Sequence, residues 1–302
     1  LMPVNTNAVF PSFDGDNLEV PNVSYTQFLS PHFGVFLGKI ATISSTSGDM
    51  NAFAHGKGDS NFMNLAFNVN PVSLITPYSA LGGGVVIMPG KDPEDATISL
   101  SILDAEGNPG TAGFDTVFEG GTVYSTEARL RTHFFGKTGH QLIGGGYSDK
   151  LYTSLDQNFR YIIENRRLKA TSGAWCVYYN FDQYLYEPEE GSGKGWGVFG
   201  RAGVSDGDPN PLEYFWSIGI GGKGLIPGRA NDGFGIGIYD IITSNTNVTS
   251  FVGLNDEWGV EAFYNIALTP SAQFSPDIQY IDGAGPNSDA AVILGLRLKL
   301  VF

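Results

Sequence analysis

The chain has 302 residues, with 41 glycines, 13% aromatic residues and only 16% charged residues, a composition that favours strands and turns over long helices. The formal net charge of -14 argues against a nucleic-acid partner, because phosphate binding needs a cationic surface. A single cysteine, Cys176, excludes an intramolecular disulfide and a cysteine-based zinc cluster. No run of about 18 consecutive apolar residues occurs, which excludes a transmembrane helix and leaves a membrane barrel open.

Alternation of apolar with small or polar residues, the pattern of β-strands, recurs along the whole chain. We count about 14 such runs, longer than the about 5 or 6 residues usual in soluble sheets. Long strands in this number indicate a wide closed sheet. The predicted strands are residues 19–30, 33–43, 60–68, 79–88, 96–103, 121–135, 139–148, 171–185, 195–206, 216–222, 232–242, 257–268, 271–282 and 291–302.

Turn residues separate these runs, and counting strands backwards from the C-terminus assigns each turn to a side. Residues 135–139, 226–233 and 269–270 are short turns on the side of the C-terminus, and 150–170 and 243–256 are longer loops on the other side. Short turns at one end and long loops at the other are typical of outer-membrane barrels. The count fails upstream, where 44–59 becomes a long connection on the short-turn side, so one strand before residue 121 is missed or wrongly included.

One predicted strand carries a row of ionisable residues. In STEARLRTHFF, Ser125, Glu127, Arg129, Arg131 and His133 project to one face. Four ionisable side chains in a row cannot be buried in a dry core, so they line either a lumen or a solvated outer surface. The matching strands add charged groups to that face: Asp182, Arg201, Glu261, Asp277, Arg297 and Lys299.

Large aromatic residues lie at the ends of several predicted strands, as they do in the interfacial girdles of membrane barrels. These residues are Trp196, Trp258, Tyr186, Tyr214 and Tyr280. The same side chains would also cap the ends of a soluble β-sandwich.

Four ordered stretches carry a resemblance to a known family: residues 140–157, 178–186, 195–240 and 261–282. They resemble the OprB-like carbohydrate-selective porins of Gram-negative outer membranes. The resemblance implies an all-β fold, a transmembrane antiparallel β-barrel of 16 strands that is usually monomeric. It also implies passive, sugar-selective diffusion of monosaccharides such as glucose, with outer-membrane lipids around a single barrel domain over residues 1–302. Because only about 14 strands are found, we expect the first two or three strands of the family barrel to be missing from this sequence.

A sugar pore needs groups that exchange hydrogen bonds with hydroxyls, aromatic rings that lie against a pyranose, and binding weak enough to release the permeant. A solvated wall charge paired across strands is the alternative for each candidate. By alternation, the lumen candidates are Glu127, Arg129, Arg131, Tyr178, Asn180, Asp182, Phe199, Arg201, Glu261, Asn265 and Arg297.

The loop at 150–170 shows a capping-box pattern over Ser154–Gln157 followed by apolar residues at helical spacing, which predicts a short helix. The loop either folds inward and narrows the pore, with Arg160, Arg166 and Arg167 supplying cations, or caps the mouth of the barrel from outside. Asp206, Asp208 and Asn210 have the spacing of a calcium loop, but Pro211 and Ser217 stand where that loop needs Gly and Glu, so we interpret 206–211 as a tight turn. We predict no metal and no cofactor.

Two other functions stay open: a barrel that hydrolyses lipids, and a soluble sugar-binding β-sandwich. The four histidines form no HxxxH pair and no GxSxG elbow is present, so we predict no enzyme. The last strand places Val292 and its alternate neighbours toward lipid, and Arg297 and Lys299 toward the lumen or its rim. Its terminal Phe302 resembles the signal by which assembly machinery recognises outer-membrane proteins, so we expect that end to be intact.

Overall fold

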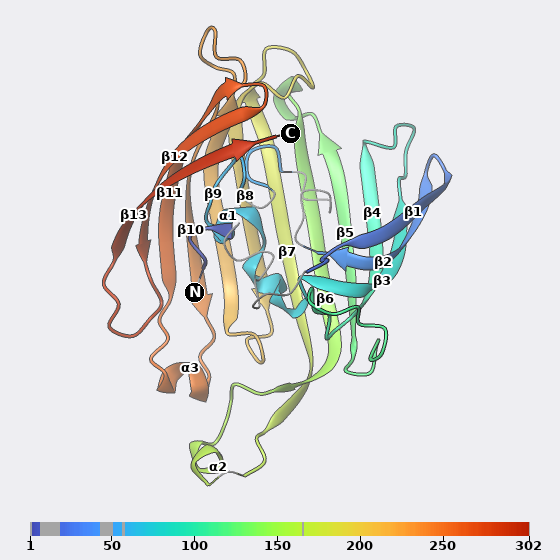
Figure 1. Ribbon diagram of the computed structural model, residues 1–302, viewed down its shortest axis with the longest axis vertical. Coiled ribbons are helices and arrows are strands. Elements are labelled where there is room, and N and C mark those ends of the chain that lie inside the picture. Colours follow the sequence, from blue (N-terminus) through green and yellow to red (C-terminus); the bar gives the residue numbers. More distant parts are fainter. Residues whose placement is uncertain (1, 7–18, 43–50, 56–57, 165, 302) are drawn as a thin grey trace.

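The computed structural model describes the chain except for residues 1, 7–18, 43–50, 56–57, 165 and 302. Its strands form one antiparallel sheet in which every strand pairs with its neighbours in chain order, and the sheet curves around a central space (Figure 1). The thirteen strands among the described residues are β1 (Val23–Ser30), β2 (Phe33–Ala41), β3 (Ser79–Ile87), β4 (Ala96–Asp104), β5 (Thr122–Thr132), β6 (Gly139–Thr153), β7 (Ala170–Tyr186), β8 (Gly195–Ser205), β9 (Leu212–Lys223), β10 (Gly233–Thr243), β11 (Glu257–Thr269), β12 (Ala272–Asp282) and β13 (Ala291–Leu300).

Helices are few and short, and no helix in the described ranges is long and apolar enough to cross a membrane. They are α1 (Leu65–Asn68), η2 (Pro71–Ile75), η3 (Phe134–Gly136), α2 (Phe159–Ile163) and α3 (Asn247–Phe251). The single curved sheet confirms the all-β barrel architecture. It also shows that the alternative of a soluble sandwich is wrong, because among the described residues no second sheet packs against the first.

Thirteen of the predicted strands are confirmed, and the fourteenth, residues 60–68, is wrong. Asn64 begins α1 there, with its side chain accepting a hydrogen bond from the backbone N–H of Ala66. Residues 62–68, apolar and asparagine alike, are all buried, so this stretch is enclosed on every side and has no alternation to set a strand face.

Removing that strand resolves the strand count upstream of residue 121. The connection between β2 and β3, residues 42–78, now lies on the long-loop side, together with 105–121, 154–169, 206–211, 244–256 and 283–290. The opposite side, where β13 ends, has the connections 31–32, 88–95, 133–138, 187–194, 224–232 and 270–271. The predicted division into short turns and long loops is therefore confirmed.

The pairing register confirms the predicted alternation of faces. Arg129 pairs with Leu142, Leu142 with Asn180 and Asn180 with Arg201, so these four residues point to the inside of the curve. On β13 the outward residues are the large apolar ones, and Leu294 and Leu296 are 78% and 73% exposed. An apolar outer face and a polar inner face are the arrangement of a membrane barrel.

The aromatic residues predicted at strand ends lie on the outer face at both ends of the sheet. Trp258 of β11 and Tyr280 of β12 are diagonal neighbours on the long-loop side, with ring centroids 5.3 Å apart. Tyr214 lies on the same side. Tyr186 and Trp196 pair with each other on the opposite side. Two such belts are what an interfacial girdle requires.

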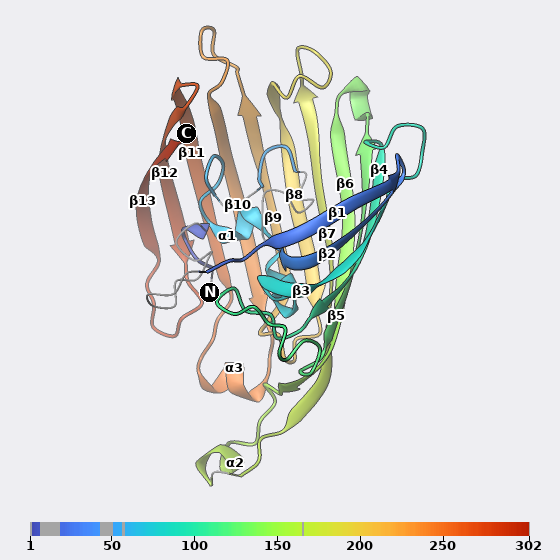
Figure 2. The same ribbon diagram turned by 45° about the vertical axis from the view of Figure 1, so that its right-hand side comes forward.

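Among the described residues, no ladder joins β1 to β13, so the sheet has two free edges. Figure 2 shows β1, β2 and β3 crossing the front of the curve toward the region of β13.

If the outer face meets lipid, the cost of a charge there depends on depth. Ile218 lies at the centre of β9 and Tyr214 near its end, and both point outward. We expect Ile218→Arg to lower the free energy of unfolding by about 2–4 kcal/mol and Tyr214→Arg by about 0–1 kcal/mol. Urea unfolding in lipid vesicles measures both, and equal costs would contradict the membrane placement.

Candidate functional site

The connection between β2 and β3 folds back into the space enclosed by the sheet. Its described part, residues 51–55 and 58–78, is called the inward segment below; it contains α1 and η2 (Figures 1 and 2). The helix η2 packs against β6, β7, β8 and β9, and α1 packs against β10. The inward segment therefore lies against one part of the wall and narrows the lumen, a role that the sequence analysis considered only for the loop at 150–170.

Glycines on the inner face of β8, β9 and β10 make room for the apolar side chains of the inward segment. A methyl group added to these glycines would overlap a side chain of the segment, at 2.5–2.7 Å. The glycine and side-chain pairs are Gly203 with Val72, Gly221 with Phe53, Gly235 with Phe62, and Gly237 with Phe67. Phe62 stacks on Phe67, with centroids 4.5 Å apart, and meets Phe263 of β11 edge-on at 4.9 Å. These contacts form an apolar core inside the barrel.

Glu261, a predicted sugar-contacting residue, holds the inward segment instead of facing open space. Its side chain is completely buried, and its carboxylate accepts hydrogen bonds from the backbone N–H groups of Met63 and Asn64, the latter at 2.9 Å. Asn64 also donates from its side chain to Gln279 of β12 at 3.2 Å. A carboxylate is a strong acceptor, so this contact fixes the start of α1 against the wall.

Arginine and lysine side chains of the wall bind the carbonyl and acidic groups of the inward segment. Arg297 donates to the carbonyls of Gly58 and Asn61, the latter at 2.8 Å. Lys299 Nζ lies 2.6 Å from Asp59 Oδ2 and 2.8 Å from Ser60 Oγ. Both cations are placed on the inner face of β13, as predicted, and both contact the segment.

Four further predicted residues also contact the inward segment, three through hydrogen bonds and one through its ring. Arg201 donates to the carbonyl of Ala54, and Asn265 Nδ2 donates to the carbonyl of Ser60 at 2.9 Å. Asn180 Oδ1 accepts a hydrogen bond from Asn51 at 2.8 Å. Phe199 is fully buried against Phe62 and Phe67, so it belongs to the apolar core between the segment and the wall.

The wall formed by β4, β5, β6 and β7 carries the other predicted residues. Tyr178 donates its hydroxyl to Glu127 at 2.6 Å, and His140 Nδ1 lies 3.0 Å from both oxygens of the buried Asp182 carboxylate. Arg129 lies beside His140, Asn180 and Asp182, around a small gap that Asn51 also lines. The structure thus brings together cationic, anionic, amide and phenolic groups on this wall.

Arg131 lies at the end of β5, away from that group. Its guanidinium faces the acidic turn after β3, at 3.5 Å from Glu94, 3.9 Å from Asp95 and 4.0 Å from Asp92. These acids are half exposed or more, so the ion pairs are the solvated wall contacts that the alternative interpretation expects.

The loop at 150–170 extends beyond the long-loop end of the sheet (Figure 1). Its helix α2 confirms the predicted helix, but Asn158 caps it, with Oδ1 accepting from Arg160 N at 3.1 Å. Ser154 instead donates to Asp208 at 2.7 Å, so the predicted capping box is wrong by one turn. Phe159 packs on Phe251 of α3, with centroids 4.3 Å apart.

The three arginines of this loop, Arg160, Arg166 and Arg167, are therefore exposed beyond the long-loop end of the sheet, and Arg166 Nε lies 2.7 Å from Glu164. The turn at 206–211 is held by its own polar residues. Asp206 accepts a hydrogen bond from Trp175 N at 3.0 Å, and Asn210 donates to the carbonyl of Val72 at 3.0 Å. The described residues contain no group of three or more His, Cys, Asp or Glu side chains arranged to hold a metal.

Glu261→Ala tests the attachment of the inward segment. Two buried backbone N–H groups lose their acceptor, at a cost of about 1–3 kcal/mol each, so we expect hydrogen–deuterium exchange over 62–66 to rise about ten-fold or more. Glu213→Ala on β9 is the control, because that side chain does not contact the segment through any hydrogen bond of the described residues. Equal exchange in both variants would contradict the attachment.

The contact between Lys299 and Asp59 predicts a pH dependence. Burial acts to raise the pKa of Asp59, but the hydrogen bond and charge of Lys299 outweigh it, and the pKa lies below its ordinary value. A depressed folded-state pKa means that the contact is complete above the unfolded value of about 3.9 and is lost as the pH falls below it. The Asp59 side chain is 47% exposed, so the effect is small.

We therefore expect hydrogen–deuterium exchange over 58–61 to be up to a few-fold slower in the wild type than in Asp59→Asn at pH 6, and the difference to shrink as the pH falls below about 3.9. Comparing the two proteins at the same pH removes the intrinsic pH dependence of exchange. The exposed Asp289→Asn is the control and leaves the difference unchanged. A difference that does not shrink between pH 6 and pH 3 would contradict the assignment.

Comparisons with known proteins agree with this geometry. The family model of the carbohydrate-selective porin, OprB family, matches residues 4–302. The structure of Pseudomonas putida OprB at high pH superposes with a TM-score of 0.75 at 18% identity, over 93% of this chain and 73% of that one. The low-pH structure of the same porin gives 0.54 at 15% identity, over 91% and 64%. At these identities the structures support the fold alone, and no curated protein sequence matches the chain. The family match over nearly the whole chain shows that it belongs to the OprB family of carbohydrate-selective porins.

Proposed function

We propose that this porin lets monosaccharides such as glucose diffuse passively across the outer membrane of a Gram-negative bacterium, along the β4–β7 wall. The observation that carries the proposal is the position of the inward segment. Its apolar core covers the inner face of β8–β11, its helix η2 also packs against β6 and β7, and its polar groups contact β12 and β13. The polar groups of β4 and β5, with Tyr178 of β7 beside them, are left as the wall of the path.

The groups on this wall are suited to sugar hydroxyls. Glu127 and Tyr178 form one hydrogen-bonded pair, and Ser101 and Ser125 form another with their hydroxyls 2.5 Å apart. Hydroxyl and carboxylate groups exchange hydrogen bonds with a sugar as it passes, and the phenol ring offers an apolar surface to a pyranose. Of the predicted sugar contacts, we keep Glu127, Arg129 and Tyr178 as the ones that face the path.

Arg201, Glu261, Asn265, Arg297 and Phe199 are proposed to act on sugar passage indirectly, by fixing the inward segment that sets the width of the lumen. Asp182 orients His140 and Arg131 faces an acidic turn, so we place both at the border of the path. Arg160, Arg166 and Arg167 stay proposals for the entrance, since their loop lies at the long-loop mouth.

We propose no catalytic role for the chain. His140 and Asp182 resemble the base and its orienting acid in a hydrolase, but no serine, threonine or cysteine side chain of the described residues hydrogen-bonds to the His140 ring. A lipid hydrolase would need such a nucleophile. Phe302 lies outside the described residues, so its recognition by the assembly machinery stays a prediction.

Arg129→Ala is the test of the wall, and Arg166→Ala at the loop is its matched control. We expect Arg129→Ala to reduce the ratio of glucose flux to that of a matched larger solute about two- to ten-fold, since a hydrogen bond to a charged group contributes about 1.5–3 kcal/mol at most and binding in a pore is weak. Liposome swelling measures the ratio.

Arg166→Ala leaves that ratio unchanged if the wall and not the loop selects the sugar. Loss of selectivity in Arg166→Ala with full selectivity in Arg129→Ala would assign the constriction to the loop. Equal swelling rates of the wild type for both solutes would remove the selectivity itself.

A further inference from the structure

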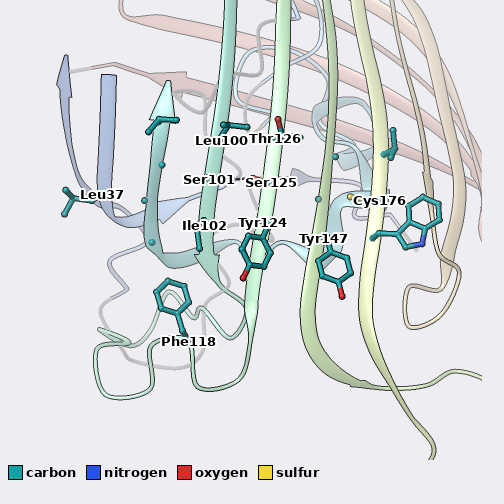
Figure 3. A pocket seen from close by; sticks show the side chains of 18 residues that line it. Leu37, Leu100, Ser101, Ile102, Phe118, Tyr124, Ser125, Thr126, Tyr147 and Cys176 are labelled. Carbon is teal, nitrogen blue, oxygen red and sulfur yellow. Dashed lines mark hydrogen bonds between the residues drawn. The ribbon is translucent and has the colours of Figure 1, made fainter. Parts of the chain in front are cut away.

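The outer face of the sheet has a hollow between β2 and β7. It has a volume of about 1100 Å³ and is called the outer groove below, defined by Gly83, Leu100, Phe118, Tyr124, Tyr147 and Trp175 (Figure 3). The defining strand residues point outward, on the face opposite the lumen, because their neighbours Ser125 and Gly146 pair on the inner side. The groove thus lies outside the sugar path.

The hollow arises because some outward positions on neighbouring strands carry small side chains. Gly83 lies between Leu37 of β2 and Ile102 of β4, and Gly145 lies beside Thr126 of β5. The surrounding outward positions carry large side chains, whereas these three are small. The small side chains at these positions, on either side of the large Leu100 and Ile102 of β4, leave a depression in an apolar surface.

Phe118 covers one end of the groove. The connection 105–121 folds back over the outer face, where Lys39 Nζ donates to the carbonyl of Pro109 at 3.0 Å. Phe118 has a φ of 62°, in the left-handed region that a bulky residue adopts only when its surroundings hold it there. Figure 3 shows its ring at the end of the groove where Tyr124 and Tyr147 lie. Phe114 of the same connection is 73% exposed, so this connection presents apolar rings outward.

The chemistry of the lining identifies the occupant. No charged side chain lines the groove, and its lining surface is almost entirely apolar. Its outward hydroxyls are those of Tyr124, Tyr147 and Thr126, and the two phenols lie toward the long-loop end, where a girdle of aromatic rings meets lipid headgroups. A ligand with a long apolar body and a polar end fits this distribution.

We propose that the outer groove binds one acyl chain of a membrane lipid in the leaflet on the long-loop side, with the lipid headgroup beside Tyr124 and Tyr147. The proposal rests on the membrane placement that is part of the proposed function. It goes beyond that function, because it assigns a specific lipid site to one place on an outer face that otherwise contacts lipid without preference. Phe118 closes over the chain, and Gly83, Thr126 and Gly145 form the floor.

Photolabelling tests the site. The intact protein is placed in vesicles of phosphatidylethanolamine and phosphatidylglycerol with a small fraction of a phospholipid that carries a diazirine in its acyl chain. After irradiation and digestion, we expect adducts on peptides with Phe118, Tyr124 and Tyr147 to exceed those around Ile218 and Ile236 several-fold. Those two residues lie on an apolar outward face of β9 and β10 that does not line the groove.

Thr126→Trp fills the floor of the groove and reduces its adducts several-fold, whereas Ile218→Trp on the other face does not. Phe118→Ala, which removes only the cover, reduces the groove adducts as well and serves as the test variant if Thr126→Trp does not fold.

Adducts spread equally over the groove and the β9–β10 face would overturn the site. Covalent links between two copies of the protein in place of lipid adducts would assign the groove to a second copy. Glucose flux is measured on the same vesicles. If glucose flux is absent while lipid labelling of the groove stays specific, the proposed sugar transport is contradicted and the lipid site is not.

Discussion

The structure depends on one constraint: polypeptide inside a barrel must find partners for its backbone N–H and C=O groups. The inward segment has only two short helices, α1 and η2, so most of these groups cannot be satisfied within it. The wall supplies several of the partners, and residues 3 and 6 supply others. Glu261 accepts two N–H groups, and Arg297, Arg201 and Asn265 donate to carbonyls. The charges on this part of the wall are therefore explained by the segment that they hold, before any permeant is considered.

This constraint divides the barrel into two parts. The wall of β8–β10 combines glycines with buried aromatic rings, because a segment packed against a sheet needs close approach as well as hydrogen bonds. Part of the high glycine content of the chain is explained in this way. The wall of β4–β7 keeps polar groups that pair with each other, as Tyr178 does with Glu127. Strand β7 belongs to both parts, because its Asn180 holds the inward segment and its Tyr178 forms part of the polar wall.

Alternation predicted the faces of the strands correctly, including the charged row of β5 and the cations of β13, because the side-chain period of a strand is fixed. It could not predict the partner of an inward side chain. Glu127 and Glu261 both occupy inward positions of an alternating strand pattern. Glu127 pairs with Tyr178 of the wall, whereas Glu261 binds the backbone at the start of α1. The partner of Glu261 lies 197 residues away in the chain, in the stretch that was predicted to be a strand. Two signals together could have revealed the inward segment: the asparagine- and phenylalanine-rich stretch at 60–68, and the inward-facing glycines of β8, β9 and β10 against which it packs.

The glycine run of β6 links the two faces of the sheet. Gly144 points inward, and a methyl group there would lie 2.5 Å from the Tyr178 ring, so the absence of a side chain lets that ring reach Glu127. Gly145 points outward and forms part of the floor of the outer groove. A sheet is one residue thick, so small residues in succession must make room on both faces. These two adjacent positions therefore place a phenol in the lumen and a depression on the outer face, and larger residues there would alter both.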